Sequence, residues 1–265
     1  MKTKAEIVKD WLPRYTGRPL AKFGEYILLS NFHNYVEMFA ERFGVEVLGR
    51  SHPMQSATAE NLTILNFGMG SAMAATVMDL LAAIEPKAVL FLGKCGGLKK
   101  TKVGDFILPI AAIRGEGTSN DYMPPEIPAL PSFRLQRAVS AMIVKHGFDY
   151  WTGTVYTTNR RVWEHDENFK ETLRRTRSMA VDMETATIFA AGFANEIPCG
   201  ALLLVSDQPM IPEGVKTELS DRNVTANFVE KHIRIGIEAL KLVRRHGRSV
   251  KHLRFEEDLE DEMGD

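Results

Sequence analysis

The chain has 265 residues, of which 45% are hydrophobic, and a formal net charge of −1 at pH 7. This length and apolar content suffice for a large buried core, and the near-zero net charge argues against a protein that binds nucleic acid by broad phosphate neutralisation. The two cysteines, Cys95 and Cys199, are too few for a disulfide framework or for a four-ligand zinc site of their own.

The N-terminal segment predicts a short helix and no targeting signal. Residues 1–15 carry scattered charges and contain no apolar core segment, so we expect neither a signal peptide nor a membrane span, and a cytoplasmic location. Residues 3–11 have the pattern of one amphipathic helix, which we expect Pro13 to stop.

Two strand-helix pairs come next. The apolar segment YILLS (26–30) predicts a buried strand, and the following apolar residues at helical spacing predict a helix that ends at Gly44. A second strand, LTILNF (62–67), leads through Gly68-Met69-Gly70 to a helix with Ser71 as its expected N-cap. Backbone N–H groups at this loop can bind an anion or a sugar, but a simple tight turn explains the glycines equally well.

Another glycine-rich stretch follows the buried strand AVLFL (88–92). We interpret Gly93-Lys94-Cys95-Gly96-Gly97-Leu98 as a turn in which the backbone comes close to another group. Lys94 is either a solvated lysine or a cation that faces a ligand, and the glycines around it favour the second interpretation. Cys95 is expected to be a small buried hydrophobic residue rather than a nucleophile.

The middle of the chain alternates strands with a long irregular segment. VGDFILPIAAI (103–113) predicts one or two strands, and residues 114–131 contain PPEIPALP, which excludes regular structure there. A helix is expected over 132–146, followed by the strand YWTGTVY (150–156) and a polar turn that contains Arg160 and Arg161. These arginines either are solvated or clasp a phosphate, and spacing alone favours the solvated state.

A strand-helix-strand unit spans residues 178–207. A short apolar run ends near Glu184, TATIFAAGFAN (185–195) predicts a helix, and GALLLVS (200–206) predicts a strand that ends at Asp207. If both strands belong to a parallel sheet, Glu184 and Asp207 lie at the same sheet edge and face one crevice. We expect a single domain over residues 1–247 and a disordered acidic tail over residues 248–265.

Two carboxylates in one crevice suit the cleavage of a glycosidic bond, in which one acid protonates the leaving group. The alternative is that Glu184 merely begins a helix and Asp207 merely caps a turn, and on spacing alone this alternative is favoured. A dinucleotide site is weakly supported, because Met73 stands where the dinucleotide fingerprint requires its third glycine.

Several motifs together resemble a known family. NFGMGSA (66–72), LGKCGGL (92–98), VDMET (181–185) and LLLVSDQP (202–209) resemble the nucleoside phosphorylase and nucleosidase superfamily. A closer resemblance, to the catalytic domain of bacterial AMP nucleosidases, is carried by GKCGGL (93–98), VGDFILP (103–109), PPEIPALP (124–131), TGTVYTTNRRVWE (152–164) and AVDMETATI (180–188). The resemblance implies a three-layer α/β/α fold with a mixed central sheet. It also implies a homo-oligomer, expected to be a hexamer built from dimers.

The resemblance also implies roles for individual residues. Asp207 matches the general acid that protonates the departing purine, and Glu184 and Met183 match the ribose contacts. The other positions assigned by resemblance to the substrate site are Gly68, Gly70, Ser71, Gly93, Lys94, Asn159, Arg160, Arg161 and Ser206.

Departures from the family pattern favour water over phosphate as nucleophile. Phosphorylases place an arginine and a serine before the Cys-Gly pair, and here Phe91 and Lys94 occupy those positions. Lys94, Arg160 and Arg161 are then left to bind the 5′-phosphate of a nucleotide. We therefore expect hydrolysis of AMP to adenine and ribose 5-phosphate without metal or organic cofactor. The alternatives are a phosphorylase or hydrolase of unphosphorylated purine nucleosides, and a nucleotide-binding module without turnover.

Overall fold

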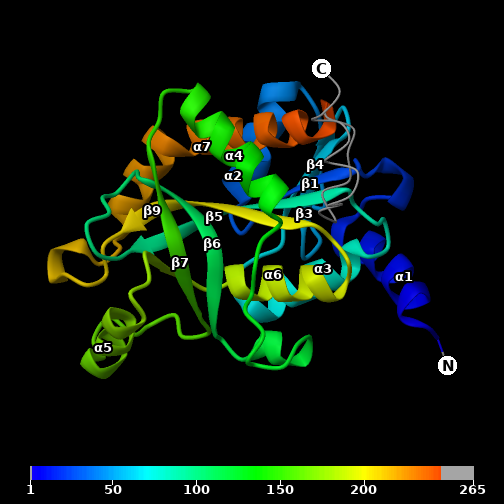
Figure 1. Cartoon of the computed structure of the whole chain (residues 1–265). Coiled ribbons are helices and arrows are strands. Elements are labelled where there is room, and N and C mark those ends of the chain that lie inside the picture. The colour runs from blue at the N-terminus through cyan, green and yellow to red at the C-terminus, as the bar shows by residue number, and fades with distance from the viewer. Residues whose placement is uncertain (1, 246–265) are drawn as a thin grey trace, which may run out of the picture.

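The computed structural model describes residues 2–245, and a mixed nine-stranded sheet forms its centre (Figure 1). The strands are β1 (Tyr26–Ser30), β2 (Val47–Leu48), β3 (Gln55–Ala59), β4 (Leu62–Asn66), β5 (Ala88–Gly97), β6 (Phe106–Gly115), β7 (Tyr150–Thr158), β8 (Ala180–Asp182) and β9 (Cys199–Asp207). Their order in the sheet is β2-β3-β4-β1-β5-β8-β7-β6-β9. Because β9 also pairs with β5, strands β5 to β9 close into a ring.

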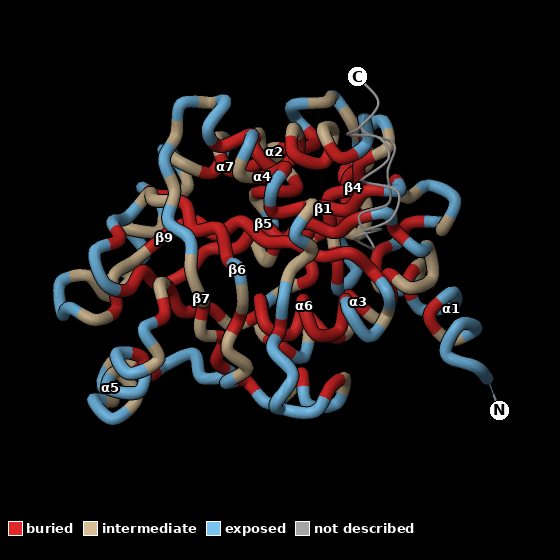
Figure 2. Tube along the Cα trace, in the orientation of Figure 1, coloured by how far each residue is buried: buried red, intermediate tan, exposed pale blue. Residues whose placement is uncertain are grey.

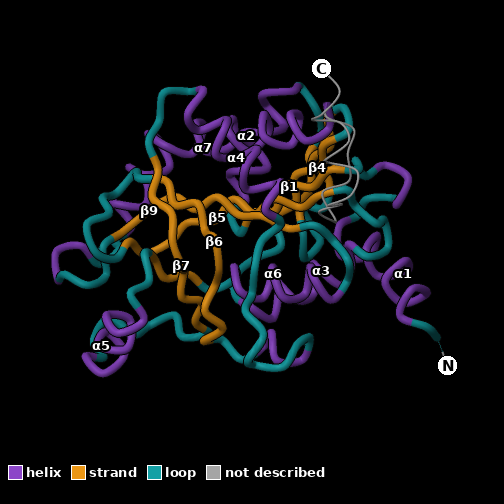
Figure 3. Tube along the Cα trace, viewed as in Figure 1, coloured by secondary structure: helices purple, strands orange, loops and turns teal. Residues whose placement is uncertain are grey.

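Helices cover the sheet on both faces, as Figures 1 and 3 show. They are α1 (Lys4–Thr16), α2 (His33–Phe43), α3 (Ser71–Leu81), α4 (Phe133–Lys145), α5 (Glu167–Thr176), α6 (Thr185–Ala194) and α7 (Glu218–Arg245), with short 3₁₀ helices at Leu20–Lys22, Thr118–Asp121 and Pro212–Gly214. Helices α2, α4 and α7 share one apolar core with the sheet, and α1, α3 and α6 share another on the opposite face. The expected three-layer α/β/α architecture with a mixed sheet is confirmed.

The central strands are apolar on both faces because both faces are covered. Every residue of β1 is buried, and so is every residue of β5, as the red tube at the centre of Figure 2 shows. Uninterrupted apolar runs are typical of such strands. For this reason the sequence pattern located them correctly.

Two local predictions were wrong. Helix α1 continues through Pro13 to Thr16 and ends at Gly17, whose φ of +64° favours glycine. The helix continues because Val8, Leu12 and Thr16 are buried along one face. Pro13 has no N–H to donate to the carbonyl of Lys9, but Lys9 is exposed. The basic stretch after Ile237, which the sequence predicts to be helical, belongs to a helix that begins already at Glu218. The expected tail at 248–265 lies outside the described residues.

The glycine-rich segment after AVLFL is the end of strand β5 rather than a turn. A Cβ atom at Gly96 would lie 2.8 Å from Pro209 Cγ, and one at Gly97 would lie 2.7 Å from Val205 Cγ1. The glycines therefore allow neighbouring backbone and side chains to approach the strand closely while it stays in the sheet.

The segment 114–131 contains more order than expected. It includes the 3₁₀ helix Thr118–Asp121 and a β-bridge between Ala112 and Ala129. The Arg114 guanidinium organises it by donating to the carbonyl oxygens of Met123 at 2.6 Å and Ile127 at 2.8 Å. Hydrogen bonds from one half-buried arginine thus replace the strand pairing that the prolines exclude.

Strands β8 and β9 run in opposite directions, so the expected parallel strand-helix-strand unit is wrong. Strand β5 is parallel to β9 but antiparallel to β8. Only the last two residues of β5, Gly96 and Gly97, pair with β8. The register between β5 and β9 shifts at Cys95/Gly96, and Gly96 then pairs with both Asp207 of β9 and Val181 of β8. The ends of β8 and β9 therefore meet at the end of β5.

Candidate active site

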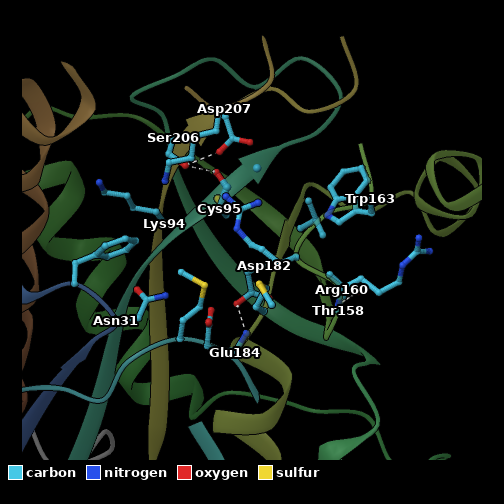
Figure 4. A pocket seen from close by; sticks show the side chains of 17 residues that line it. Asn31, Lys94, Cys95, Thr158, Arg160, Trp163, Asp182, Glu184, Ser206 and Asp207 are labelled. Atoms are coloured by element: carbon cyan, nitrogen blue, oxygen red, sulfur yellow. Dashed lines mark hydrogen bonds between the residues drawn. The ribbon is translucent and has the colours of Figure 1, made fainter. Parts of the chain in front are cut away.

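A cleft opens where strands β5, β8 and β9 end. It contains about 620 Å³ of empty space, part of which is open to solvent. Asp207 lies at one end of it, Asp182 and Glu184 lie at the other, and Cys95 lies between them (Figure 4). The residues that line it are Asn31, Phe32, Met69, Lys94, Cys95, Gly96, Thr158, Arg160, Arg161, Trp163, Val181, Asp182, Met183, Glu184, Ser206, Asp207 and Lys216. The two predicted carboxylates therefore face one cleft, although their strands are antiparallel.

Asp182 fixes the backbone that carries Glu184. Its Oδ2 atom accepts hydrogen bonds from the backbone N–H groups of Glu184 at 3.2 Å and Thr185 at 2.7 Å. Its Oδ1 atom accepts one from Thr157 Oγ1 on β7 at 2.7 Å. Asp182 thus satisfies orphan N–H groups at the start of α6 and ties this start to the sheet.

The loop before α3 fixes Met183 and Glu184 from the other side. The backbone N–H of Gly70 donates to Glu184 Oε1 at 2.7 Å, and Ser71 Oγ donates to the Met183 carbonyl at 2.6 Å. Gly70 rather than Ser71 is the N-cap of α3, because its φ of +93° favours glycine. Gly68, Gly70 and Ser71 are not among the residues that line the cleft.

Glu184 is a buried carboxyl next to a second one. It is 2% exposed, and burial together with the neighbouring Asp182 charge raises its pKa to about 8. Hydrogen bonds from Gly70 and from the Asn31 side chain oppose the rise. At neutral pH, Glu184 of the free protein is therefore mostly protonated.

Asp207 occupies the opposite end of the cleft. Burial raises its pKa, while a hydrogen bond from Ser206 Oγ to Oδ1 at 2.6 Å and the charges of Lys216 and Arg161 oppose the rise. A carboxyl with a raised pKa holds its proton closer to neutral pH, as a general acid requires. Ser206 is thus a direct partner of Asp207 as well as a lining residue.

Lys94 lines the cleft, but its ammonium group is already paired. It donates to Asp221 Oδ1 at 2.8 Å and to Thr225 Oγ1 at 3.0 Å, both on α7, and lies 4.6 Å from the centroid of the Phe32 ring. Its side chain is only 3% exposed. In Figure 4 it points away from Asp207.

The turn after β7 places only part of the predicted set at the cleft. Arg160 and Arg161 line it, whereas Asn159 is exposed and does not. Arg160 pairs with Asp166 at 2.8 Å, and its guanidinium points away from the cleft in Figure 4. Arg161 lies 3.6 Å from Glu164.

The positions where phosphorylases hold phosphate are apolar or sequestered. Phe91 is fully buried, and its ring centroid lies 5.8 Å from that of Phe67. Gly93 is buried within β5, where a Cβ atom would lie 3.0 Å from Leu203 Cδ2, and it does not line the cleft. Close packing between strands therefore accounts for Gly93.

Several cleft residues were not predicted. The sequence could have indicated Asp182, because this residue lies two positions before Glu184 and is the last residue of β8. Asn31 directly follows β1, so the sheet-edge argument used for Glu184 applies to it as well. Lys216 has no local signal, because the loop after β9 brings it to the cleft.

Cys95 lies in the cleft wall, and burial raises the pKa of its thiol well above its ordinary value, with the charges of Asp182 and Asp207 adding to the effect. A thiol in this state is a poor nucleophile, which supports a packing role. Within residues 2–245, no group of three or more His, Cys, Asp or Glu residues is arranged to hold a metal ion.

Curated proteins with related sequences include two enzyme classes. The chain is 29% identical to AMP nucleosidase of Escherichia coli K12 in an alignment of 284 positions, gaps included, that covers 89% of this chain and 58% of that protein. It is 27% identical to guanosine phosphorylase of Halorubrum lacusprofundi over 184 residues, which cover 68% of this chain and 76% of that protein. The chain thus spans little more than half the length of the E. coli relative.

Solved structures extend the likeness. This chain is 60% identical in sequence to AMP nucleosidase from Bacteroides thetaiotaomicron, and its fold matches that crystal structure with a TM-score of 0.83. The match covers 92% of this chain and 100% of that one. The structure of purine nucleoside phosphorylase from Toxoplasma gondii matches with a TM-score of 0.77 at 18% identity. The match covers 86% of this chain and 95% of that one, and it shows that the two proteins share a fold.

The resemblance seen in the sequence motifs is thereby confirmed. The sequence profile of the phosphorylase superfamily matches residues 25–243, which include every strand and all helices but α1, the 3₁₀ helix Leu20–Lys22 and the last residues of α7. The chain belongs to the phosphorylase superfamily.

Proposed function

We propose that this protein hydrolyses the N-glycosidic bond of AMP and releases adenine and ribose 5-phosphate. One observation carries the proposal: Glu184 and Asp207 face one cleft in a chain that is 60% identical to a Bacteroides AMP nucleosidase. The proposal treats residues 1–247 as one catalytic domain. It places the enzyme in nucleotide metabolism and purine salvage, in the cytoplasm.

Asp207 is assigned as the general acid. It donates its proton to the imidazole-ring nitrogen of adenine while the bond between the purine and C1′ breaks. The raised pKa of Asp207 and its position at one end of the cleft support this assignment. The attacking water forms the new bond to C1′, and the proton it releases restores Asp207 through solvent.

Glu184 and Met183 are assigned to the ribose. A protonated Glu184 carboxyl can both donate to and accept from the two ring hydroxyls. Positive charge that develops on the sugar lowers the pKa of Glu184, so the carboxyl releases its proton to solvent, and the ionised form then stabilises the oxocarbenium-like state. The bonds from Gly70 and Ser71 that fix residues 183 and 184 support this positioning role.

Water rather than phosphate is assigned as the nucleophile. Phe91 is fully buried against Phe67, so this position offers no charge to an anion. Lys94 is tied to Asp221 and Thr225. A phosphate anion would need cations at these positions.

The test uses AMP and adenosine, each with and without inorganic phosphate. We expect AMP to exceed adenosine by at least about a hundredfold in kcat/KM, since charge-assisted hydrogen bonds to the phosphate contribute roughly 1.5 to 3 kcal/mol each. Ribose 5-phosphate under both conditions supports hydrolysis. A bisphosphorylated sugar formed only with phosphate would show a phosphorylase, and equal use of both substrates would point to a nucleosidase for free nucleosides.

We also propose that the chain forms a homo-oligomer, expected to be a hexamer. Support comes from an apolar groove between the start of α4 and the end of α6, beside which Phe133 is 67% exposed and Phe193 is 73% exposed. Light scattering coupled to size exclusion tests this, and a monomer at micromolar concentration would reject it. No described helix is long and apolar enough to cross a membrane.

A further inference from the structure

Four basic side chains line the cleft, and they differ in how far they are already engaged. Arg160 is held by Asp166 at 2.8 Å, and its guanidinium lies 5.2 Å from the centroid of the Phe169 ring, on the side of α5. Arg161 is 55% exposed and is loosely placed beside Glu164. Neither arginine is fixed in an orientation toward the cleft.

Lys94 and Lys216 form one unit with Asp221. Both ammonium groups contact Asp221 Oδ1, Lys94 at 2.8 Å and Lys216 at 2.9 Å. Both also lie over the Phe32 ring, at 4.6 Å and 5.7 Å from its centroid. Two cations on one carboxylate leave a net positive charge at this wall of the cleft.

The two lysines are not equally accessible. The side chain of Lys94 is 3% exposed and has a further partner, Thr225 Oγ1, whereas the side chain of Lys216 is 21% exposed. Lys216 also acts on groups inside the cleft, since its charge lowers the pKa of Asp207 and of Cys95 against the effect of burial. The positive charge of the unit is therefore presented to the cleft by Lys216.

A phosphate monoester requires such a cation here. The other basic residues of the cleft, Arg160 and Arg161, lie beside Asp166 and Glu164, and the far end of the cleft carries the carboxyl groups of Asp182 and Glu184. Lysine binds phosphate as a point charge with three donors, so the ammonium of Lys216 can keep Asp221 as one partner and still donate to phosphate oxygens.

We propose that Lys216 binds the 5′-phosphate of the substrate, and that Lys94 is a positioning residue that acts through Asp221: it compensates the charge of this carboxylate and so leaves the charge of Lys216 available to the phosphate. This inference rests on the proposed hydrolysis of AMP. It adds a phosphate contact from the loop after β9 that sequence reasoning did not assign, and it gives Lys94 an indirect role.

The central experiment compares Lys216→Met with the wild-type protein on AMP and adenosine. The measured quantity is the ratio of kcat/KM for AMP to kcat/KM for adenosine. One charge-assisted hydrogen bond corresponds to a roughly ten- to hundredfold fall in this ratio. Lys216→Arg keeps the charge, so its ratio should lie between those of Lys216→Met and the wild type. The matched control is Lys87→Met, which removes an exposed lysine paired with Glu25 and should not change the ratio.

Two outcomes would overturn the inference. An unchanged ratio in Lys216→Met would show that the phosphate lies elsewhere. An equal loss on both substrates would show that Lys216 acts through Asp207 or through the fold of the loop. Failure of the proposed function is seen separately, because the wild-type protein would then release no adenine from AMP. In that case the difference in calorimetric affinity for AMP and adenosine, measured for wild type and Lys216→Met, tests Lys216 without turnover.

The role of Lys94 is tested separately, by measuring KM for AMP in two variants. In Lys94→Met, Asp221 retains only Lys216, so the net charge of the unit falls to zero, and KM for AMP should rise roughly tenfold with little change in kcat. In Lys94→Met/Asp221→Asn, the charge of Lys216 is again uncompensated, and KM for AMP should return toward the wild-type value. A double variant as weak as Lys94→Met would show that Lys94 acts only on folding.

Discussion

The buried carboxyl of Glu184 makes a prediction about stability that does not depend on the substrate. Its pKa rises from the ordinary value of 4.5 to about 8 in the folded chain. Between these two pH values the folded chain keeps a proton that the unfolded chain has released, so the free energy of unfolding must fall as pH rises through this window. The contribution is fully present below 4.5 and is lost by about pH 8.

The magnitude follows from the size of the shift. Each pH unit inside the window changes the free energy of unfolding by about 1.4 kcal/mol, and from about pH 6 to about pH 8 the loss amounts to roughly 2 kcal/mol. Glu184→Gln keeps the shape of the protonated carboxyl and can still accept from the Gly70 N–H, but it cannot ionise. The variant should therefore gain roughly 2 kcal/mol relative to the wild-type protein over this range.

Urea unfolding of both proteins at several pH values across the range measures the difference. Glu171→Gln is the matched control, because Glu171 lies on α5 and its side chain is 58% exposed. Parallel curves for the wild-type protein and Glu184→Gln would refute the reasoning. They would mean that Glu184 is ionised in the folded protein and that its polar neighbours outweigh burial.

The remaining predictions concern the chemistry of the cleft. Asp207→Asn should lower turnover of AMP roughly a hundred- to ten-thousandfold while calorimetric binding of AMP persists, and near-normal turnover would exclude a general acid at this position. Glu184→Gln should lose turnover more than binding, and the wild-type protein should discriminate against 2′-deoxy-AMP; equal cleavage of both nucleotides would exclude the ribose contact. Asp182→Asn removes a charge that raises the pKa of Glu184, so the acidic limb of the kcat/KM profile that Glu184 sets should move to lower pH, and an immobile limb would contradict the coupling. Burial raises the pKa of the Cys95 and Cys199 thiols, so iodoacetamide should label the native protein at neutral pH far more slowly than the urea-unfolded chain, and similar rates by intact mass would contradict this.

The sequence alone determined the features that depend on local pattern. Strands β1, β5 and β9 are buried on both faces, and such strands appear as unbroken apolar runs. The helix end at Gly44 was visible because a φ of +63° favours glycine. The motifs VDMET (181–185) and LLLVSDQP (202–209), which contain Glu184 and Asp207, identified the family.

Tertiary structure decided which direction the strands run and which charges meet. Nothing local shows that β8 pairs antiparallel with the last residues of β5, because a three-residue strand carries too little pattern to fix its partner. Lys94 looked free in the sequence, since its partner Asp221 lies 127 residues further along the chain.

The protonation state of Glu184 could likewise not be predicted from the sequence. The pKa of Glu184 depends on how much water the fold removes and on the distance to Asp182, and neither quantity is a property of the five residues VDMET. The loop after β9 brings Lys216 to the cleft, where it meets Asp221 of α7 beside Lys94. Residue types that supply the chemistry can be read from the chain, but desolvation and long-range charge pairing exist only after the fold has closed.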